Sequence, residues 1–325
     1  MTDPTPTPTS IRCLNSAHGK DWTMYHGDCV EVIRQIPDNS VDLQLFSPPF
    51  ANVYTYSDSP RDMGNCDNER EFMEHYRFLA GELYRTLRPG RLCVIHCKDL
   101  IRYRGAHGRA GMHDLPGDLV RVHEEAGFQY HCRVTVWKCP VEEQRKTKNH
   151  GLLYKQIRAD SSFSRVGMPE YLIVMRKWPE NEEQEGMISP VPHTHADFPL
   201  SQWQEWASPV WRMTEDAESA WQKHGLPVWM DVNHRDVLNV TAAREDKDER
   251  HMCPLSLDLI DRALGLWSNP GDTVLSAFGG VGSEGIGSLR QGRKFVGVEL
   301  KESYFERACV NLKREEGAEQ LGLFG

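Results

Sequence analysis

Short apolar runs alternate with amphipathic stretches along most of the chain. Residues 41–46 form a mostly apolar run that stops at two prolines, which predicts a buried strand because proline cannot continue a central strand. Apolar residues then recur at helical spacing from Glu71 to Leu87, and Arg88-Pro89-Gly90 predicts the end of that helix. The same pattern predicts further strands at 92–95, 129–137, 171–175, 273–276 and 294–299, and helices at 115–126, 255–267, 284–290 and 304–313. This alternation predicts an α/β fold, with a mostly parallel sheet and helices on both faces.

The alternation is interrupted after residue 178 by a stretch rich in acidic residues and tryptophan. We expect this stretch to form an inserted subdomain with aromatic packing and an acidic surface. The Pro/Thr-rich start of the chain predicts disorder. The expected organisation is a disordered tail (1–21), one half of the main domain (22–178), the insertion (179–234), the other half of the main domain (235–315) and a C-terminal tail (316–325).

The composition narrows the class of protein. Hydrophobic residues make up 39% and charged residues 26% of the chain, which is ordinary for a globular domain. We find no apolar run of about 18 residues and no signal-peptide pattern, so we expect a cytoplasmic protein without membrane contact. The nine cysteines are irregularly spaced, which predicts reduced thiols and no metal site. The net charge of -9 argues against nucleic acid on every face but not against a local basic groove.

A glycine-rich turn, residues 278–283 (Phe-Gly-Gly-Val-Gly-Ser), joins a predicted strand to a predicted helix. Glycines allow a tight turn and close approach to a ligand, and the N-terminus of a helix offers free N–H groups. Glu299 ends the next predicted strand, where an acid can accept hydrogen bonds from ribose hydroxyls. Together these features predict a nucleoside-cofactor site; the alternative is a structural turn with Glu299 as a surface acid.

A second motif, Ser47-Pro48-Pro49-Phe50, follows the predicted strand 41–46. Residues before proline are held extended, so this loop fixes its carbonyl groups in space. The Ser47 hydroxyl and the Pro48 carbonyl can bind the hydrogens of an amino group on a planar ring, while Phe50 stacks on that ring. Taken alone, the motif could equally be a turn that ends a strand.

The two motifs together resemble those of the DNA amino-methyltransferases. Ser47-Pro48-Pro49-Phe50 resembles their catalytic D/N/S-P-P-Y/F/W motif, and residues 278–282 resemble their F-x-G-x-G cofactor motif. The catalytic motif comes first, an order similar to that of the β class. The resemblance therefore implies a circularly permuted, Rossmann-like methyltransferase fold. Residues 25–29 and 251–255 also look like cofactor segments of the family, and the insertion occupies the position of its target-recognition region.

The resemblance implies a bacterial or phage enzyme, with or without a restriction partner. It would transfer a methyl group from S-adenosylmethionine to adenine N6 or cytosine N4 of a base flipped out of double-stranded DNA, without a metal. The residues implied in cofactor binding are Asp28, Pro254, Phe278, Gly280, Gly282, Ser283 and Glu299. The chain has no Pro-Cys pair, which speaks against methylation of a ring carbon. The serine at the first position of the catalytic motif does not decide between adenine and cytosine as the target base.

Two further segments predict partners. The stretch 142–177 is the most basic of this acidic chain, and we expect it to lie on DNA phosphates unless it is a solvated charged loop. Its candidate DNA contacts are Arg145, Lys146, Lys148, Lys155, Arg158 and Arg165. The C-terminal Gln320-Leu321-Gly322-Leu323-Phe324 resembles peptides that bind the bacterial sliding clamp; a tail packed on its own domain is the alternative. A homodimer is open, because β-class relatives are often dimers.

Two other functions stay open from the sequence. The first is methylation of an RNA base or a protein amide, although such enzymes usually carry the cofactor motif before the catalytic one. The second is a DNA-binding module without catalysis, against which both intact motifs speak.

Overall fold

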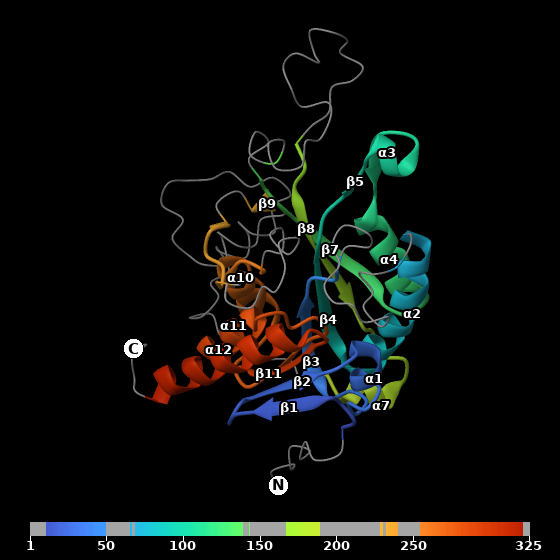
Figure 1. Ribbon diagram of the computed structural model, residues 1–325. Helices are drawn as coiled ribbons and strands as arrows, with labels where there is room; N and C mark the ends of the chain where they lie inside the picture. Colours follow the sequence, from blue (N-terminus) through green and yellow to red (C-terminus); the bar gives the residue numbers. More distant parts are fainter. Residues whose placement is uncertain are drawn as a thin grey trace, which may run out of the picture.

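The computed structural model describes residues 11–49, 66, 69–138, 143, 167–188, 228–229, 232–239 and 254–320 (Figure 1). The strands are β1 (Asn15–His18), β2 (Trp22–His26), β3 (Val41–Phe46), β4 (Leu87–Cys97), β5 (Leu100–Arg102), β6 (Gly111–His113), β7 (Gln129–Val136), β8 (Glu170–Arg176), β9 (Val228–Trp229), β10 (Thr273–Ser276) and β11 (Lys294–Glu299). The helices are α1 (Cys29–Ile33), α2 (Glu69–Thr86), α3 (Arg104–His107), α4 (Leu115–Glu125), α7 (Glu182–Gly186), α10 (Leu257–Trp267), α11 (Ser283–Arg290) and α12 (Glu302–Gln320).

A nine-stranded sheet runs through the molecule in the order β1-β2-β11-β10-β3-β4-β8-β7-β9. Neighbouring strands from β2 to β4 are parallel. Among the nine strands, only β1 and β8 run against the others. The prediction of a mostly parallel sheet is therefore confirmed. Strands β5 and β6 form a separate antiparallel hairpin.

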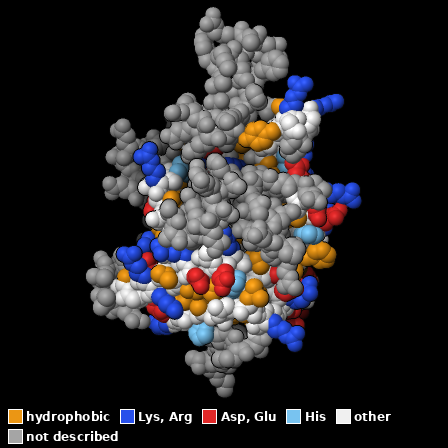
Figure 2. Space-filling view, in the orientation of Figure 1, with side chains coloured by type: hydrophobic (Ala, Val, Ile, Leu, Met, Phe, Trp, Pro, Cys, Tyr) orange, Lys and Arg blue, Asp and Glu red, His pale blue; other side chains and the backbone are white. Residues whose placement is uncertain are grey.

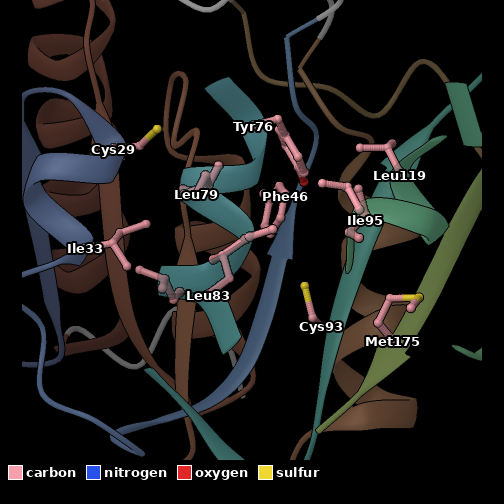
Figure 3. Packing of buried hydrophobic residues seen from close by; sticks show 14 of the residues in the cluster. Cys29, Ile33, Phe46, Tyr76, Leu79, Leu83, Cys93, Ile95, Leu119 and Met175 are labelled. Carbon is pink, nitrogen blue, oxygen red and sulfur yellow. The ribbon is translucent and has the colours of Figure 1, made fainter. Parts of the chain in front are cut away.

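Helices cover both faces of the sheet, as predicted. On one face, α1, α2 and α4 bury a cluster that includes Phe46, Leu79 and Leu83 (Figure 3). On the other face, α10, α11 and α12 bury a second cluster around Ile260 and Leu264. Each such side chain contributes about 1.5–3 kcal/mol when it is removed from water. These two layers hold the strand ends in fixed positions.

The chain changes direction between the two central strands β10 and β3. From β10 the chain passes through α11 to its outer neighbour β11, whereas from β3 it passes through α2 to its outer neighbour β4. Helices α11 and α2 cover opposite faces of the sheet. In open α/β sheets, ligands bind beyond the carboxyl ends of the strands at such a point. Val274 pairs with Leu43 and Leu275 with Gln44, so β3 and β10 end at the same edge of the sheet.

The predicted limits of both tails are wrong. Strand β1 lies inside the stretch 1–21, where its backbone pairs with β2 from Asn15 opposite His26 to His18 opposite Thr23. Helix α12 extends through Gln320, so the C-terminal tail does not begin at residue 316. Backbone pairing and helix propagation order these segments although their side chains are largely polar. Of the insertion 179–234, much lies outside the described residues.

The predicted end of the helix before residues 88–90 is confirmed, because α2 ends at Thr86. Residues 88–90 themselves belong to β4, which therefore begins earlier than the predicted strand 92–95. The Gly90 N–H donates to the Lys177 carbonyl at 2.7 Å, which pairs this segment with the end of β8. The Lys177 ammonium donates to the carbonyls of Tyr84 and Leu87 at 2.8 Å each. Lys177, which is distant in the sequence, thus binds backbone carbonyls at the end of α2, and β4 begins directly after the helix.

Within the described part of the chain, no helix is both long and apolar enough to cross a membrane. Every cysteine of that part is a free thiol. The same residues contain no group of three or more histidines, cysteines or acids placed to hold a metal ion.

Candidate active site

The loops after β3 and β10 lie side by side at the carboxyl edge of the sheet. The Phe46 ring, at the end of β3, packs against the Phe278 ring, in the glycine turn after β10, with 5.9 Å between the ring centres. The residue after Phe46 is Ser47. The structure therefore brings together two motifs that lie far apart in the sequence.

The glycine turn requires glycine at two positions. Gly280 and Gly282 have φ angles of 52° and 88°, in the left-handed region that side chains disfavour. A Cβ atom on Gly282 would lie 3.3 Å from the Cβ of Ala308 in α12. A Cβ atom on Gly280 would meet nothing within 4 Å, so the described chain leaves open space on that side of the turn.

The Glu299 carboxylate lies against the turn from the adjacent strand. Its Oε2 accepts the Gly280 N–H at 2.8 Å, and its Oε1 accepts the Lys301 N–H at 2.8 Å. These bonds fix the side chain at the end of β11. Each carboxylate oxygen can accept more than one hydrogen bond, which is the property that binding of ribose hydroxyls requires.

Asp28 lies at the same carboxyl edge of the sheet, after β2, which is the outer neighbour of β11. The Gly27 N–H donates to the Glu299 carbonyl at 2.9 Å, which joins the two acidic segments. The Asp28 carboxylate also caps α1 by accepting the Glu31 N–H at 2.9 Å. Pro254 lies three residues before the first residue of α10, a helix whose buried residues pack in the same cluster as those of α11. Its predicted contact with the cofactor stays a prediction.

Ser283 begins α11 and is 2% exposed. Its hydroxyl and that of Ser276, at the end of β10, are buried without a hydrogen-bond partner among the described residues. A helix N-terminus, two unpartnered hydroxyls, open space beside Gly280 and a fixed acid together fit a nucleoside cofactor.

In the loop after β3, Pro48 and Pro49 are buried, and Phe50 lies outside the described residues. The Ser47 Oγ lies 3.3 Å from Nδ1 of His96, a residue of β4. His96 Nε2 lies 3.1 Å from Oε2 of Glu170, at the start of β8, and Lys138 Nζ lies 3.0 Å from Oε1 of the same carboxylate. His96, Glu170 and Lys138 were not predicted as site residues from the sequence. The available signal was a histidine inside the apolar run of β4.

Glu170 is ionised at the centre of this group. Burial by itself raises the pKa of its carboxyl, but the hydrogen bonds from His96 and Lys138, together with the positive charge of Lys138, outweigh burial and hold the pKa well below its ordinary value. The carboxylate is therefore a hydrogen-bond acceptor for both neighbours.

A second buried acid, Glu284, lies in the first turn of α11 and was also missed. Burial, with a smaller contribution from the charge of Glu299, raises its pKa from 4.5 to about 8, although its own backbone N–H opposes the shift. The side chain is thus protonated at neutral pH. Between pH 4.5 and about 8 the unfolded chain releases this proton and the folded protein retains it, so stability falls as pH rises through that window.

Replacing Glu284 by glutamine is therefore expected to raise the free energy of unfolding at about pH 8 by about 4 kcal/mol, and to have little effect below pH 4.5. Urea unfolding of both proteins across this range measures the difference. Glu124→Gln, on the exposed side of α4, is the control. A gain for Glu284→Gln that does not depend on pH would contradict the assignment.

The remaining predicted site residues are not placed by the structure. The basic candidates between Arg145 and Arg165 lie outside the described residues, as do Leu321, Leu323 and Phe324. Gln320 is the last residue of α12.

The sheet order and the two loops at its switch point define the class as a Rossmann-like methyltransferase. A family model described as DNA methylase matches residues 41–310, and the chain belongs to this family. This membership confirms the expected resemblance and S-adenosylmethionine as the methyl donor. The description as circularly permuted stays a prediction.

Among curated relatives, the chain is 23% identical over 282 residues to the type II methyltransferase M.BamHI of Bacillus amyloliquefaciens, covering 85% of this chain and 54% of that protein. The chain thus spans about half the length of M.BamHI. It is 24% identical to M.BglII of Bacillus subtilis, covering 90% of this chain and 69% of the relative.

Two solved structures share the fold. TTHA0409 of Thermus thermophilus, assigned as a DNA modification methylase and solved with S-adenosyl-L-methionine, superposes with a TM-score of 0.59 at 21% identity, covering 91% of this chain and 96% of that one. The cytosine-N4-specific PvuII DNA methyltransferase gives 0.51 at 15% identity, covering 92% of each chain.

Proposed function

We propose that the protein methylates an exocyclic amino group, adenine N6 or cytosine N4, of a base flipped out of double-stranded DNA. The observation that carries this proposal is the contact between the loops after β3 and β10, shown by the packing of Phe46 on Phe278. Only loops this close allow a methyl group bound at one to reach an amino group bound at the other. Alignment of two bound reactants can supply roughly 7–11 kcal/mol of the barrier.

We assign each motif one part of the task. Bound S-adenosylmethionine supplies a methyl group on a sulfonium, and the electron pair of the breaking C–S bond stays on sulfur. Phe278, Gly280, Gly282 and Ser283 cradle the cofactor, and Glu299 and Asp28 bind its hydroxyls. Ser47 and the Pro48 carbonyl bind the two amino hydrogens, Pro49 stiffens the loop, and Phe50 stacks on the base.

Sequencing with detection of modified bases tests the proposal on DNA from cells that express the protein. Methylation at one sequence context is expected with the wild-type protein and not with Ser47→Ala. Detection of N6-methyladenine or N4-methylcytosine identifies the target. The relatives leave both bases open, because YhdJ of Escherichia coli, 22% identical, is a DNA adenine methyltransferase and the PvuII enzyme is cytosine-N4-specific. Unmodified DNA from wild-type cells would sink the proposal.

The β5–β6 hairpin is a described surface suited to DNA phosphates. It begins directly after β4, at the edge that carries Ser47, and its tip exposes Tyr103, Arg104 and Arg109. Figure 2 shows lysine and arginine side chains gathered where Figure 1 places α3. The base of the hairpin is fixed, because Arg102 and His113 both contact the Glu69 carboxylate of α2.

Reversing both charges in Arg104→Glu/Arg109→Glu is expected to weaken DNA binding. The slope of log K against log salt should fall by about 1 for each arginine that contacts a phosphate. Binding titrations at several salt concentrations measure it. Lys20→Glu/Lys294→Glu, at the opposite edge of the sheet, changes the net charge equally and should leave the slope unchanged. Equal slopes for both double variants would refute the DNA-facing assignment.

The other expected partners remain proposals. We propose that the basic candidates from Arg145 to Arg165 add phosphate contacts and that the insertion reads the target sequence. The clamp-binding tail would follow directly from the end of α12, and a homodimer would match the β class.

A further inference from the structure

We infer that His96 is a positioning residue, which makes the Ser47 hydroxyl a hydrogen-bond acceptor for the target amino group and takes up the proton released by methylation. This inference rests on the proposed function. It goes further because it adds His96 and Glu170, which neither sequence motif contains, to the path of the proton.

The geometry is a continuous row of polar atoms across neighbouring strands. Ser47 directly follows β3, His96 lies near the end of β4, and Glu170 begins the adjacent β8. The contacts are 3.3 Å from Ser47 Oγ to His96 Nδ1 and 3.1 Å from His96 Nε2 to Glu170 Oε2. The His96 side chain is 12% exposed and that of Glu170 is 17% exposed, so water competes weakly for these contacts.

The ionised Glu170 decides which ring nitrogen carries the hydrogen. A carboxylate only accepts, so His96 Nε2 must be the N–H that donates to it. In the neutral ring, Nδ1 is then an acceptor, and the Ser47 hydroxyl donates its hydrogen to Nδ1. The oxygen lone pairs of Ser47 remain for an incoming N–H donor. With the opposite tautomer, the Ser47 hydrogen would compete with the amino hydrogens.

The same row of polar atoms can take up the proton that methylation releases. As the new N–C bond forms, the amino nitrogen becomes positively charged and has to lose one proton. Ser47 Oγ accepts that proton while its own hydrogen passes to His96 Nδ1. The methylated base and Ser47 end neutral, and the positive charge resides on the imidazole beside the Glu170 carboxylate. Release of the proton to water restores the starting state.

The charged groups around His96 favour this outcome. Glu170 contacts the ring directly from β8, and Lys138, after β7, holds the other oxygen of that carboxylate at 3.0 Å. His234 lies beyond them, with its Nε2 2.9 Å from the Trp137 carbonyl. Burial, then the charge of Lys138, lower the pKa of His234, whereas Glu170 and Glu143 act in the opposite direction. His234 is thus kept neutral and adds no charge against a protonated His96.

The first test does not depend on activity. Nitrogen-15 NMR of the imidazole side chains, with His96 assigned from the spectrum of His96→Gln, reports the tautomer. We expect hydrogen on Nε2 and none on Nδ1 at neutral pH. Hydrogen on Nδ1 would overturn the inference.

The second test compares the single-turnover rates of methyl transfer of variants at position 96. His96→Ala is expected to lower the rate on the order of 10²-fold. His96→Asn keeps an oxygen acceptor near the position of Nδ1 but cannot take up the proton, so it should recover only part of that loss, whereas His96→Gln, which reaches toward Glu170 instead, should recover none.

The double variant Ser47→Ala/His96→Ala separates positioning from general disruption. Because His96 acts through Ser47, the double variant should be no slower than Ser47→Ala alone. Additive losses, or equal rates for His96→Asn and His96→Gln, would refute the role of His96 and leave the proposed function standing. A wild-type protein that methylates no DNA would remove both.

Discussion

A Ser47→Ala variant is expected to bind S-adenosylmethionine as the wild type does and to transfer methyl groups on the order of 10²–10³-fold more slowly, the usual effect of losing one aligned hydrogen bond at a reacting group. Ser47 follows β3, whereas Asp28, the glycine turn and Glu299, which are assigned to the cofactor, lie at the carboxyl ends of β2, β10 and β11. The substitution removes the oxygen that binds the amino group and leaves His96 Nδ1 without its described partner. The loss should therefore fall on the chemical step.

Single-turnover kinetics and calorimetric titration of the cofactor measure these two effects separately. Ser40→Ala is the matched control, because Ser40 lies just before the other end of β3, where its hydroxyl donates to the Pro37 carbonyl at 2.7 Å. It should keep the wild-type rate. If Ser47→Ala retains full rate, or loses cofactor affinity in proportion to its rate, the assignment of Ser47 to the target base is wrong.

Replacing Gly282 by valine should have the largest effect on cofactor binding. The φ of 88° costs a residue with a side chain about 1–2 kcal/mol, and a branched one more. The new Cβ would also lie 3.3–3.4 Å from the Cβ and Cα of Ala308, so the turn has to move away from α12. That movement displaces the Gly280 N–H from Glu299. We expect S-adenosylmethionine affinity to fall at least about tenfold, with a lower melting temperature.

Gly317→Ala in α12 serves as the comparison, since an added Cβ there meets nothing within 4 Å. Alanine in a helix is favoured over glycine by about 1 kcal/mol, so this variant should be slightly more stable and bind the cofactor normally. Wild-type affinity in Gly282→Val would show that the turn does not cradle the cofactor.

The central strands were predictable because their signals are local. Strands β3 and β11 begin and end at the predicted residues, since each is a largely apolar run bounded by turn residues or a charged end. The glycine turn and the Ser-Pro-Pro-Phe loop were visible for the same reason. Their meeting at one edge was also inferable, because parallel strands in such folds share their carboxyl ends.

The rest of the site depends on contacts between distant residues. The partners of His96 are 49 and 74 positions away in the sequence, and no local pattern links them. The early start of β4 was missed because it depends on Lys177, about ninety positions further along the chain, which binds the Leu87 carbonyl. Strand β1 was missed because its order comes from backbone pairing with β2, which leaves no mark on its polar side chains.

The position of β10 between β11 and β3 has a consequence for synthesis of the protein. The Thr273 N–H, at the start of β10, donates to the Asp42 carboxylate, and the two residues are 231 positions apart. A nascent chain on the ribosome therefore carries β3 with an unpaired edge until most of the protein has been made, and such edges promote aggregation. Premature termination should yield insoluble fragments rather than a partly active enzyme, so a cell gains methylation only from finished chains.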